Sequence, residues 1–148
     1  MIVIHQVNCF GVMGTGFAKY VKERQPGCYS DYKEKCTRFA LKHRLRDLLG
    51  TIQVYEDREI NLTIVNMFSQ FRYGRDQQYT DYDAMRSCLE KVRRRFPEDR
   101  IVAPYMIGCG AAGGDWDVVS SMLKEFRIDT STEIVLPNSL GRYNYCKR

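Results

Sequence analysis

The sequence lacks the features of several large classes of protein. None of its 148 residues belongs to an apolar run that approaches the about 18–20 residues of a membrane span. Its first residues contain no basic leader before a long apolar region, so we expect no secretion signal and a cytoplasmic protein. There are only two histidines, and no cysteine pair has the Cys-x-x-Cys spacing, so we expect no metal site and reduced thiols. The six cysteines are Cys9, Cys28, Cys36, Cys88, Cys109 and Cys146.

Neither sign of charge dominates the chain. Lys and Arg number 23 against 18 Asp and Glu, a formal net charge of +5, and 44% of the residues are hydrophobic. This composition is typical of a globular protein, and the length predicts one domain over residues 1–148. The small positive excess favours an anionic partner such as a nucleotide. A mixed solvated surface is the preferred interpretation of this excess, and we do not expect nucleic acid as the partner.

Strands alternate with helices along the chain, which predicts an α/β fold with a mixed, mainly parallel sheet. We expect strands at about Ile2–Val7, Thr51–Tyr55, Ile60–Met67, Arg100–Met106 and Glu133–Leu136. We expect helices at about Thr15–Arg24, Tyr29–Phe39 and Asp81–Phe96, and a last one capped by Asp115.

Seven of the 11 glycines lie in two short windows, each between an expected strand and an expected helix. These are Gly11, Gly14 and Gly16, then Gly108, Gly110, Gly113 and Gly114. Glycine lets the backbone approach an anion closely, and a helix N-terminus adds free N–H groups. Two such turns at the carboxyl ends of neighbouring strands would hold a diphosphate, although tight turns also need glycine for steric reasons alone. The P-loop ending Gly-Lys-Ser/Thr is absent, and we expect neither a nucleoside-triphosphatase nor a Rossmann domain.

Both windows resemble the ligand loops of macro domains. The stretch His5–Ala18 is similar to the first loop, and Pro104–Gly110, with Asp115-Trp116 beyond it, is similar to the second. The subgroup that the chain resembles contains the terminal ADP-ribose glycohydrolases and the ADP-ribose 1″-phosphate phosphatases. The resemblance spans nearly the whole chain. It implies a three-layer α/β/α sandwich that binds ADP-ribose or a related NAD-derived nucleotide and needs no cofactor.

The resemblance also implies roles for individual residues. The first loop would wrap the diphosphate through Val12, Met13, Gly14, Thr15, Gly16 and Phe17. The second would hold the phosphates and the distal ribose through Ile107, Gly108, Cys109, Gly110, Ala111, Ala112 and Gly113. Asn8 matches the position that faces the distal ribose, unless it is only a turn residue.

Two further residues have alternative interpretations. His5 matches the histidine of the phosphatases, where an ordinary pKa of about 6.5 suits proton transfer, unless it is a buried core residue. Cys109 is read as a packing residue rather than a nucleophile, because no base adjoins it. Asp115 would orient water, or serve only as a helix cap.

The chain departs from the family pattern in three places. The usual first strand with its Gly-Asp-Ile/Leu motif is missing, so adenine would be recognised by other groups such as the final strand and Asn138. No lysine follows the strand that reads Ile64–Phe68, and Ala111-Ala112 replace an aspartate. A lysine-dependent glycohydrolase mechanism is therefore not expected. The tail Leu140–Arg148 is a candidate replacement for the missing strand.

These departures leave three functional hypotheses. The first is an ADP-ribose binder that also hydrolyses a terminal phosphate or an ADP-ribosyl ester, and the second is a non-catalytic sensor or sponge for such a nucleotide. The third, suggested only by the basic charge, is a module for RNA or poly(ADP-ribose), marked by strong salt dependence. The loop Phe68–Tyr79, rich in arginine and tyrosine, is either a lid over the ligand or a solvated loop. The oligomeric state has no signature in the sequence.

Overall fold

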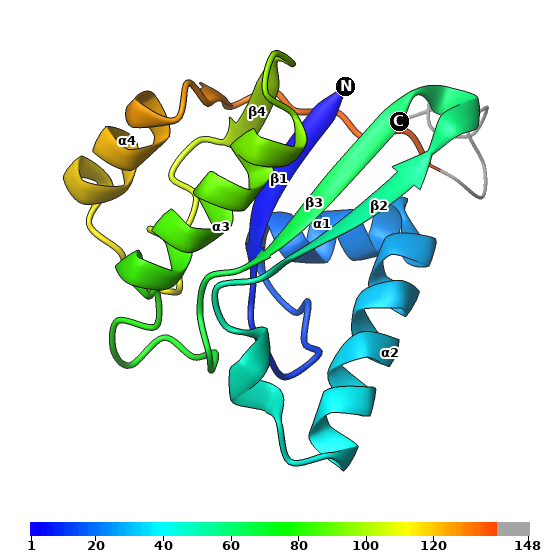
Figure 1. The fold of residues 1–148 in the computed structure, drawn as a ribbon, viewed down its shortest axis with the longest axis vertical. Coiled ribbons are helices and arrows are strands. Elements are labelled where there is room, and N and C mark those ends of the chain that lie inside the picture. Colours follow the sequence, from blue (N-terminus) through cyan, green and yellow to red (C-terminus); the bar gives the residue numbers. More distant parts are fainter. Residues whose placement is uncertain (139–148) are drawn as a thin grey trace.

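The computed structural model describes residues 1–138 and contains one five-stranded sheet with the strand order β2-β3-β1-β4-β5 (Figure 1). Its strands are β1 (Ile2–Val7), β2 (Ile52–Asp57), β3 (Leu62–Phe68), β4 (Ile101–Pro104) and β5 (Asp129–Ser131). The central strand β1 runs parallel to β3 and to β4, and β5 runs parallel to β4. Only β2 is antiparallel to its neighbour β3. The sheet is therefore mixed and mainly parallel, as the sequence predicts.

Helices cover both faces of the sheet (Figure 1). The first pair is α1 (Gly16–Arg24) and α2 (Pro26–Leu41), and the second is α3 (Tyr82–Arg95) and α4 (Trp116–Glu125). Because successive strand side chains point to opposite faces, Val3 packs toward α1 and α2, whereas its neighbour Ile4 packs toward α3 and α4. The same alternation sends Ile64 and Val65 of β3 to opposite cores. The three-layer α/β/α sandwich is confirmed.

The helix ends follow local chemistry. Pro26 ends α1, as expected, but it also begins α2 at once, because proline suits the first turn of a helix, where N–H groups have no intrahelical partner. The carboxylate of Asp81 accepts a hydrogen bond from the N–H of Ala84, and that of Asp115 accepts one from the N–H of Asp117. Both aspartates are thus the N-caps of α3 and α4.

The last strand was predicted in the wrong place. Residues 133–136 form no strand, and β5 is instead the short polar segment Asp129–Ser131, which pairs with β4. Ile134 and Leu136, which suggested a strand, pack on the core beside α1, where the Leu136 N–H donates to the Tyr20 hydroxyl at 2.9 Å. Strand β4 also ends two residues early, because Met106 adopts a left-handed backbone with φ of 63°.

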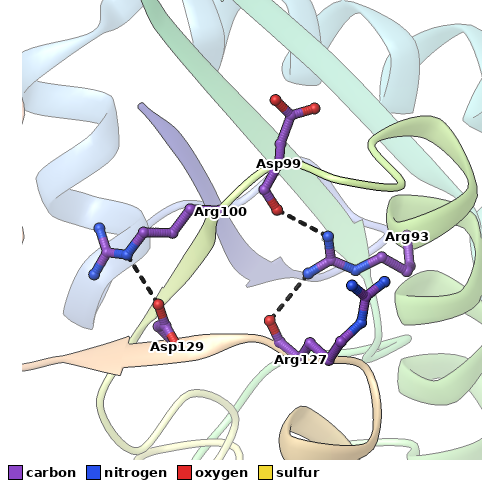
Figure 2. A network of polar contacts seen from close by, with 5 residues as sticks. All are labelled: Arg93, Asp99, Arg100, Arg127 and Asp129. Carbon is purple, nitrogen blue, oxygen red and sulfur yellow. Dashed lines mark hydrogen bonds and ion pairs between the residues drawn. The ribbon is translucent and has the colours of Figure 1, made fainter.

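Arginine side chains form a network of polar contacts near the start of β4 (Figure 2). Arg93 of α3 donates hydrogen bonds of 2.9–3.0 Å to four carbonyl oxygens, those of Phe96, Asp99, Phe126 and Arg127. These carbonyls follow the ends of α3 and α4, where helical C=O groups lack intrahelical partners. One guanidinium therefore joins the two helices, and Arg100 and Asp129 form an exposed ion pair beside it.

Some predictions concern residues or properties that the structure addresses only in part. The tail Leu140–Arg148 and Cys146 lie outside the described residues. Within residues 1–138, no helix is both long and apolar enough to cross a membrane. The same part of the chain contains no group of three or more His, Cys, Asp or Glu side chains placed to hold a metal ion.

Candidate ligand-binding cleft

A cleft of about 380 Å³ lies at the carboxyl ends of the parallel strands β1 and β4. The first glycine turn, which joins β1 to α1, forms one wall, and the second, which follows β4, forms another. Gln70, Tyr73 and Gly74 of the loop after β3 complete the lining. The two turns, almost 100 residues apart in the sequence, thus face one space, as expected for turns that follow neighbouring parallel strands.

Most of the predicted binding residues line this cleft. They are Val12, Gly14, Thr15, Gly16, Phe17, Ile107, Gly108, Gly110, Ala111 and Ala112, together with His5 and Asn8. Met13 instead is buried in the core, and Cys109, Gly113 and Asn138 lie outside the lining of the cleft.

The second turn has the spacing Gly-x-Gly-x-x-Gly over residues 108–113, which is also that of dinucleotide-binding turns. In those proteins the turn opens the following helix directly. Here α4 begins only at Trp116, after the cap Asp115. The spacing is therefore not a Rossmann fingerprint in this fold.

Asn8 shapes the first turn with every polar atom of its side chain. Its Oδ1 accepts hydrogen bonds from the N–H groups of Phe10 at 2.9 Å and Val12 at 3.3 Å, and its Nδ2 donates to the Val12 carbonyl at 2.7 Å. The hydroxyl of Tyr32, from α2, lies 2.7 Å from the Asn8 carbonyl oxygen and 2.9 Å from Oδ1. Asn8 therefore stabilises the turn by satisfying its backbone groups, as in the alternative interpretation of the sequence, and it also lines the cleft.

His5 is buried below the first turn, and its ring packs against Phe17 at the start of α1. Its Nε2 lies 2.6 Å from Oδ1 of Asn66, whose Nδ2 donates to Gln53. With the Asn66 amide oriented by that second bond, Nε2 carries the proton, and Nδ1 is an acceptor without a partner among the described residues. Burial lowers the pKa of His5 to about 4, against a smaller opposing effect of the hydrogen bond that His5 donates to Asn66. The imidazole is therefore neutral at pH 7.

The second turn is braced from below by a polar cluster that the sequence analysis missed. Thr80 Oγ1 donates to the Gly108 carbonyl at 2.6 Å, and Gln6 Nε2 donates to Thr80 Oγ1 at 2.9 Å. Ser69 Oγ in turn donates to Gln6 Oε1 at 2.7 Å. The one available signal was Gln6 itself, which with His5 is a polar residue inside a mostly apolar strand.

No Asp, Glu, Lys or Arg side chain lines the cleft in the part of the chain that the structure describes. An anion would instead meet backbone N–H groups, including those that open α1, whose N-cap Thr15 makes no side-chain capping bond. The thiol of Cys109 stays protonated, because burial and the nearby Asp115 raise its pKa to about 11. The lining is thus suited to binding an anion and poor in groups for acid–base or nucleophilic chemistry.

A second, more open cavity of about 540 Å³ adjoins the cleft and shares Gly16, Phe17, Pro104 and Tyr105 with it. Its remaining lining consists of Tyr20, Ser131, Thr132 and Ile134. Three aromatic rings therefore surround a space next to the anion-binding turns. An elongated ligand with a phosphate part and a flat apolar part fits such a pair of cavities.

The arrangement of sheet and helices matches the fold of solved macrodomain structures. The macrodomain protein of Streptomyces coelicolor superimposes with a TM-score of 0.68 over 87% of this chain and 84% of that chain, at 24% sequence identity. The Thermosipho africanus DarTG structure, in complex with ADP-ribose, gives a TM-score of 0.65 over 95% of this chain and 40% of that chain, at 17% identity. The fold that the two glycine windows implied is confirmed.

In sequence, the chain is similar to an uncharacterised 17.5 kDa protein from the tk–vs intergenic region of Enterobacteria phage T4. The two are 28% identical over 142 residues, which cover 90% of this chain and 83% of that protein. No protein-family model matches the chain.

Proposed function

We propose that the cleft binds ADP-ribose or a closely related nucleotide diphosphate. The observation that carries the proposal is the meeting of two glycine turns and the N-terminus of α1 in one cleft, which no charged side chain of residues 1–138 lines. Backbone N–H groups and a helix N-terminus bind phosphate in this way. The shared fold with DarTG, solved in complex with ADP-ribose, supports the choice of ligand.

The ligand would extend across both cavities. The diphosphate would lie between the turns at Gly14–Gly16 and Gly108–Gly110, and the base would enter the adjoining cavity between Phe17, Tyr20 and Tyr105. Asn138 is outside the lining of both cavities. Stacking on aromatic rings would thus bind the base without the aspartate of other macro domains.

We further propose that binding occurs without turnover, as in a sensor or sponge for the nucleotide. Hydrolysis of a terminal phosphate at neutral pH benefits from a general acid, but His5 is neutral there, with its pKa near 4. The side chain of Asn8 makes hydrogen bonds within its own turn, and the Asp115 carboxylate accepts the hydrogen bond that caps α4. The hydrolytic alternative rests on Nδ1 of His5, a base of low pKa that lines the cleft and has no hydrogen-bond partner within residues 1–138.

Phosphorus NMR separates these functions. At stoichiometric protein, the diphosphate signals of ADP-ribose and of ADP-ribose 1″-phosphate should shift or broaden. At catalytic protein, no free phosphate should appear from the second compound. Release of phosphate would establish the hydrolytic alternative, and unchanged spectra would refute the proposed ligand.

A variant that fills the cleft provides the control for site specificity. A Cβ atom at Gly110 meets no heavy atom within 4 Å, so Gly110→Phe places a ring in open space and should abolish binding while the fold is kept. The matched variant Ser30→Phe adds the same ring to the exposed face of α2, and binding should be unaffected. Equal binding by both variants would move the ligand site elsewhere.

A further inference from the structure

The excess positive charge of the chain is concentrated in one segment. Residues 33–46 contain six of the 23 Lys and Arg residues and one of the 18 acidic residues, a formal net charge of +5. This equals the net charge of the whole chain, so the other residues carry 17 charges of each sign. The positive and negative charges are therefore not evenly mixed along the sequence, although the composition had suggested an even mixture.

The structure places three of these six cations along one helix face. Lys35, Arg38 and Lys42 follow one another at intervals of three and four residues on α2 and at its C-cap, which places them on one stripe. Arg38 and Lys42 are exposed, and Lys35 is half-buried with its ammonium 5.9 Å from the centre of the Phe68 ring. None of the three forms an ion pair with another described residue. Burial and the charge of Arg38 lower the pKa of Lys35, as expected for crowded cations.

Two further arginines, Arg46 from the same basic segment and Arg72 from the loop after β3, stack on one aromatic ring. The guanidinium of Arg46 lies 4.0 Å from the centre of the Phe71 ring. The guanidinium of Arg72 lies 5.6 Å from the same ring and 5.1 Å from that of Phe10. Both arginines are exposed and without an ion-pair partner in residues 1–138. Stacking on the rings orients their donors while leaving them accessible to an anion.

We propose that this basic strip, formed by Lys35, Arg38, Lys42, Arg46 and Arg72, binds the phosphate backbone of a single-stranded nucleic acid. Cations that recur about every 5 Å along a helix suit a linear polyanion better than one compact anion. Beside Arg72, Tyr73, which also lines the rim of the cleft, is 53% exposed and offers a ring on which a base can stack. The proposal does not depend on which ligand occupies the cleft.

The probe is a fluorescein-labelled 20-nucleotide oligothymidylate, and binding is followed by fluorescence anisotropy between 50 and 200 mM salt. The test variant replaces the helical part of the strip: Lys35→Gln, Arg38→Gln and Lys42→Gln. The control variant removes three exposed cations from other parts of the surface: Lys22→Gln, Arg58→Gln and Lys124→Gln. Both triple variants lower the net charge by the same amount, so a difference between them reports the position of the charge. A charge-preserving variant, with Lys35→Arg, Arg38→Lys and Lys42→Arg, covers the case in which the test variant folds poorly.

We expect the test variant to bind at least tenfold more weakly at 50 mM salt, and the control and charge-preserving variants within about twofold of the natural chain. Each lost phosphate contact reduces the slope of log affinity against log salt by roughly 0.7 for a single strand, so three contacts reduce it by about two. Three results would overturn the proposal. They are no binding by the natural chain at 50 mM salt, equal losses in the test and control variants, or displacement of the oligonucleotide by polyglutamate as effectively as by unlabelled oligothymidylate. The last result would assign the strip to an acidic protein.

Discussion

Removing the hydroxyl of Tyr32 tests whether the first turn is held in place from α2. The side chain is fully buried, and its hydroxyl donates to the carbonyl and side-chain oxygens of Asn8. Tyr32→Phe removes this donor without changing the ring and leaves the buried Asn8 carbonyl short of a partner. An unsatisfied buried group of this kind costs about 1–3 kcal/mol. For a domain of this length, we expect the midpoint of thermal unfolding to fall by roughly 3–10 °C.

The same change should weaken ligand binding, because Asn8 shapes the turn that lines the cleft. Calorimetric titration with ADP-ribose well below the unfolding temperature should give a Kd raised about tenfold, which corresponds to 1.4 kcal/mol. Tyr29→Phe is the matched control, because Tyr29 lies on the same helix and its hydroxyl has no hydrogen-bond partner among the described residues. We expect that control to change stability by less than about 0.5 kcal/mol. The reasoning is refuted if urea unfolding and Kd of Tyr32→Phe both match those of the natural chain.

Three further predictions concern the histidine, the arginine network and the second turn. The pKa of His5 is about 4 in the folded chain and about 6.5 when unfolded, so its contribution of about 3 kcal/mol to the unfolding free energy is fully present above pH 6.5 and is lost as the pH falls to 4. Urea unfolding of His5→Asn between pH 4 and 7 should lack this pH dependence. A pH slope equal to that of the natural chain would contradict the prediction. Arg93→Ala removes four hydrogen bonds to carbonyl oxygens and should lower the free energy of unfolding in urea by about 2 kcal/mol. The control Arg94→Ala, at an exposed neighbour, should lower it by less than about 0.5 kcal/mol. Equal losses in the two variants would argue against the network. Gly113→Ala places a Cβ on a backbone with a φ of 73°, 3.2 Å from a backbone oxygen. Thermal unfolding should show a destabilisation of about 1–2 kcal/mol. The control Gly110→Ala, which has open space around its Cβ, should match the stability of the natural chain.

Local patterns in the sequence predicted the layers of the fold and the place of the cleft. Successive apolar residues of Ile2–Val7 and Ile64–Phe68 pack into the two cores on opposite faces of the sheet, and an aspartate caps each of α3 and α4. The glycine turns met at one cleft because both follow parallel strands that are neighbours in the sheet. The strand β5 could not be found in this way. Asp129–Ser131 is short, polar and largely exposed, and its conformation depends on pairing with β4 rather than on a side-chain pattern of its own.

The sequence by itself determined the elements other than β5, and the glycine turns, because these depend on residues close together along the chain. Only the tertiary structure decided the chemistry of the site. Asn8 is occupied by contacts with its own turn and with Tyr32 of α2, and His5 is neutral because it is buried beside Asn66 of β3. The protonation and hydrogen bonding of a side chain depend on groups that folding brings from distant parts of the sequence and on the water that folding removes. The basic strip also exists only in the folded chain, where the loop after β3 places Arg72 beside the segment that carries the excess charge.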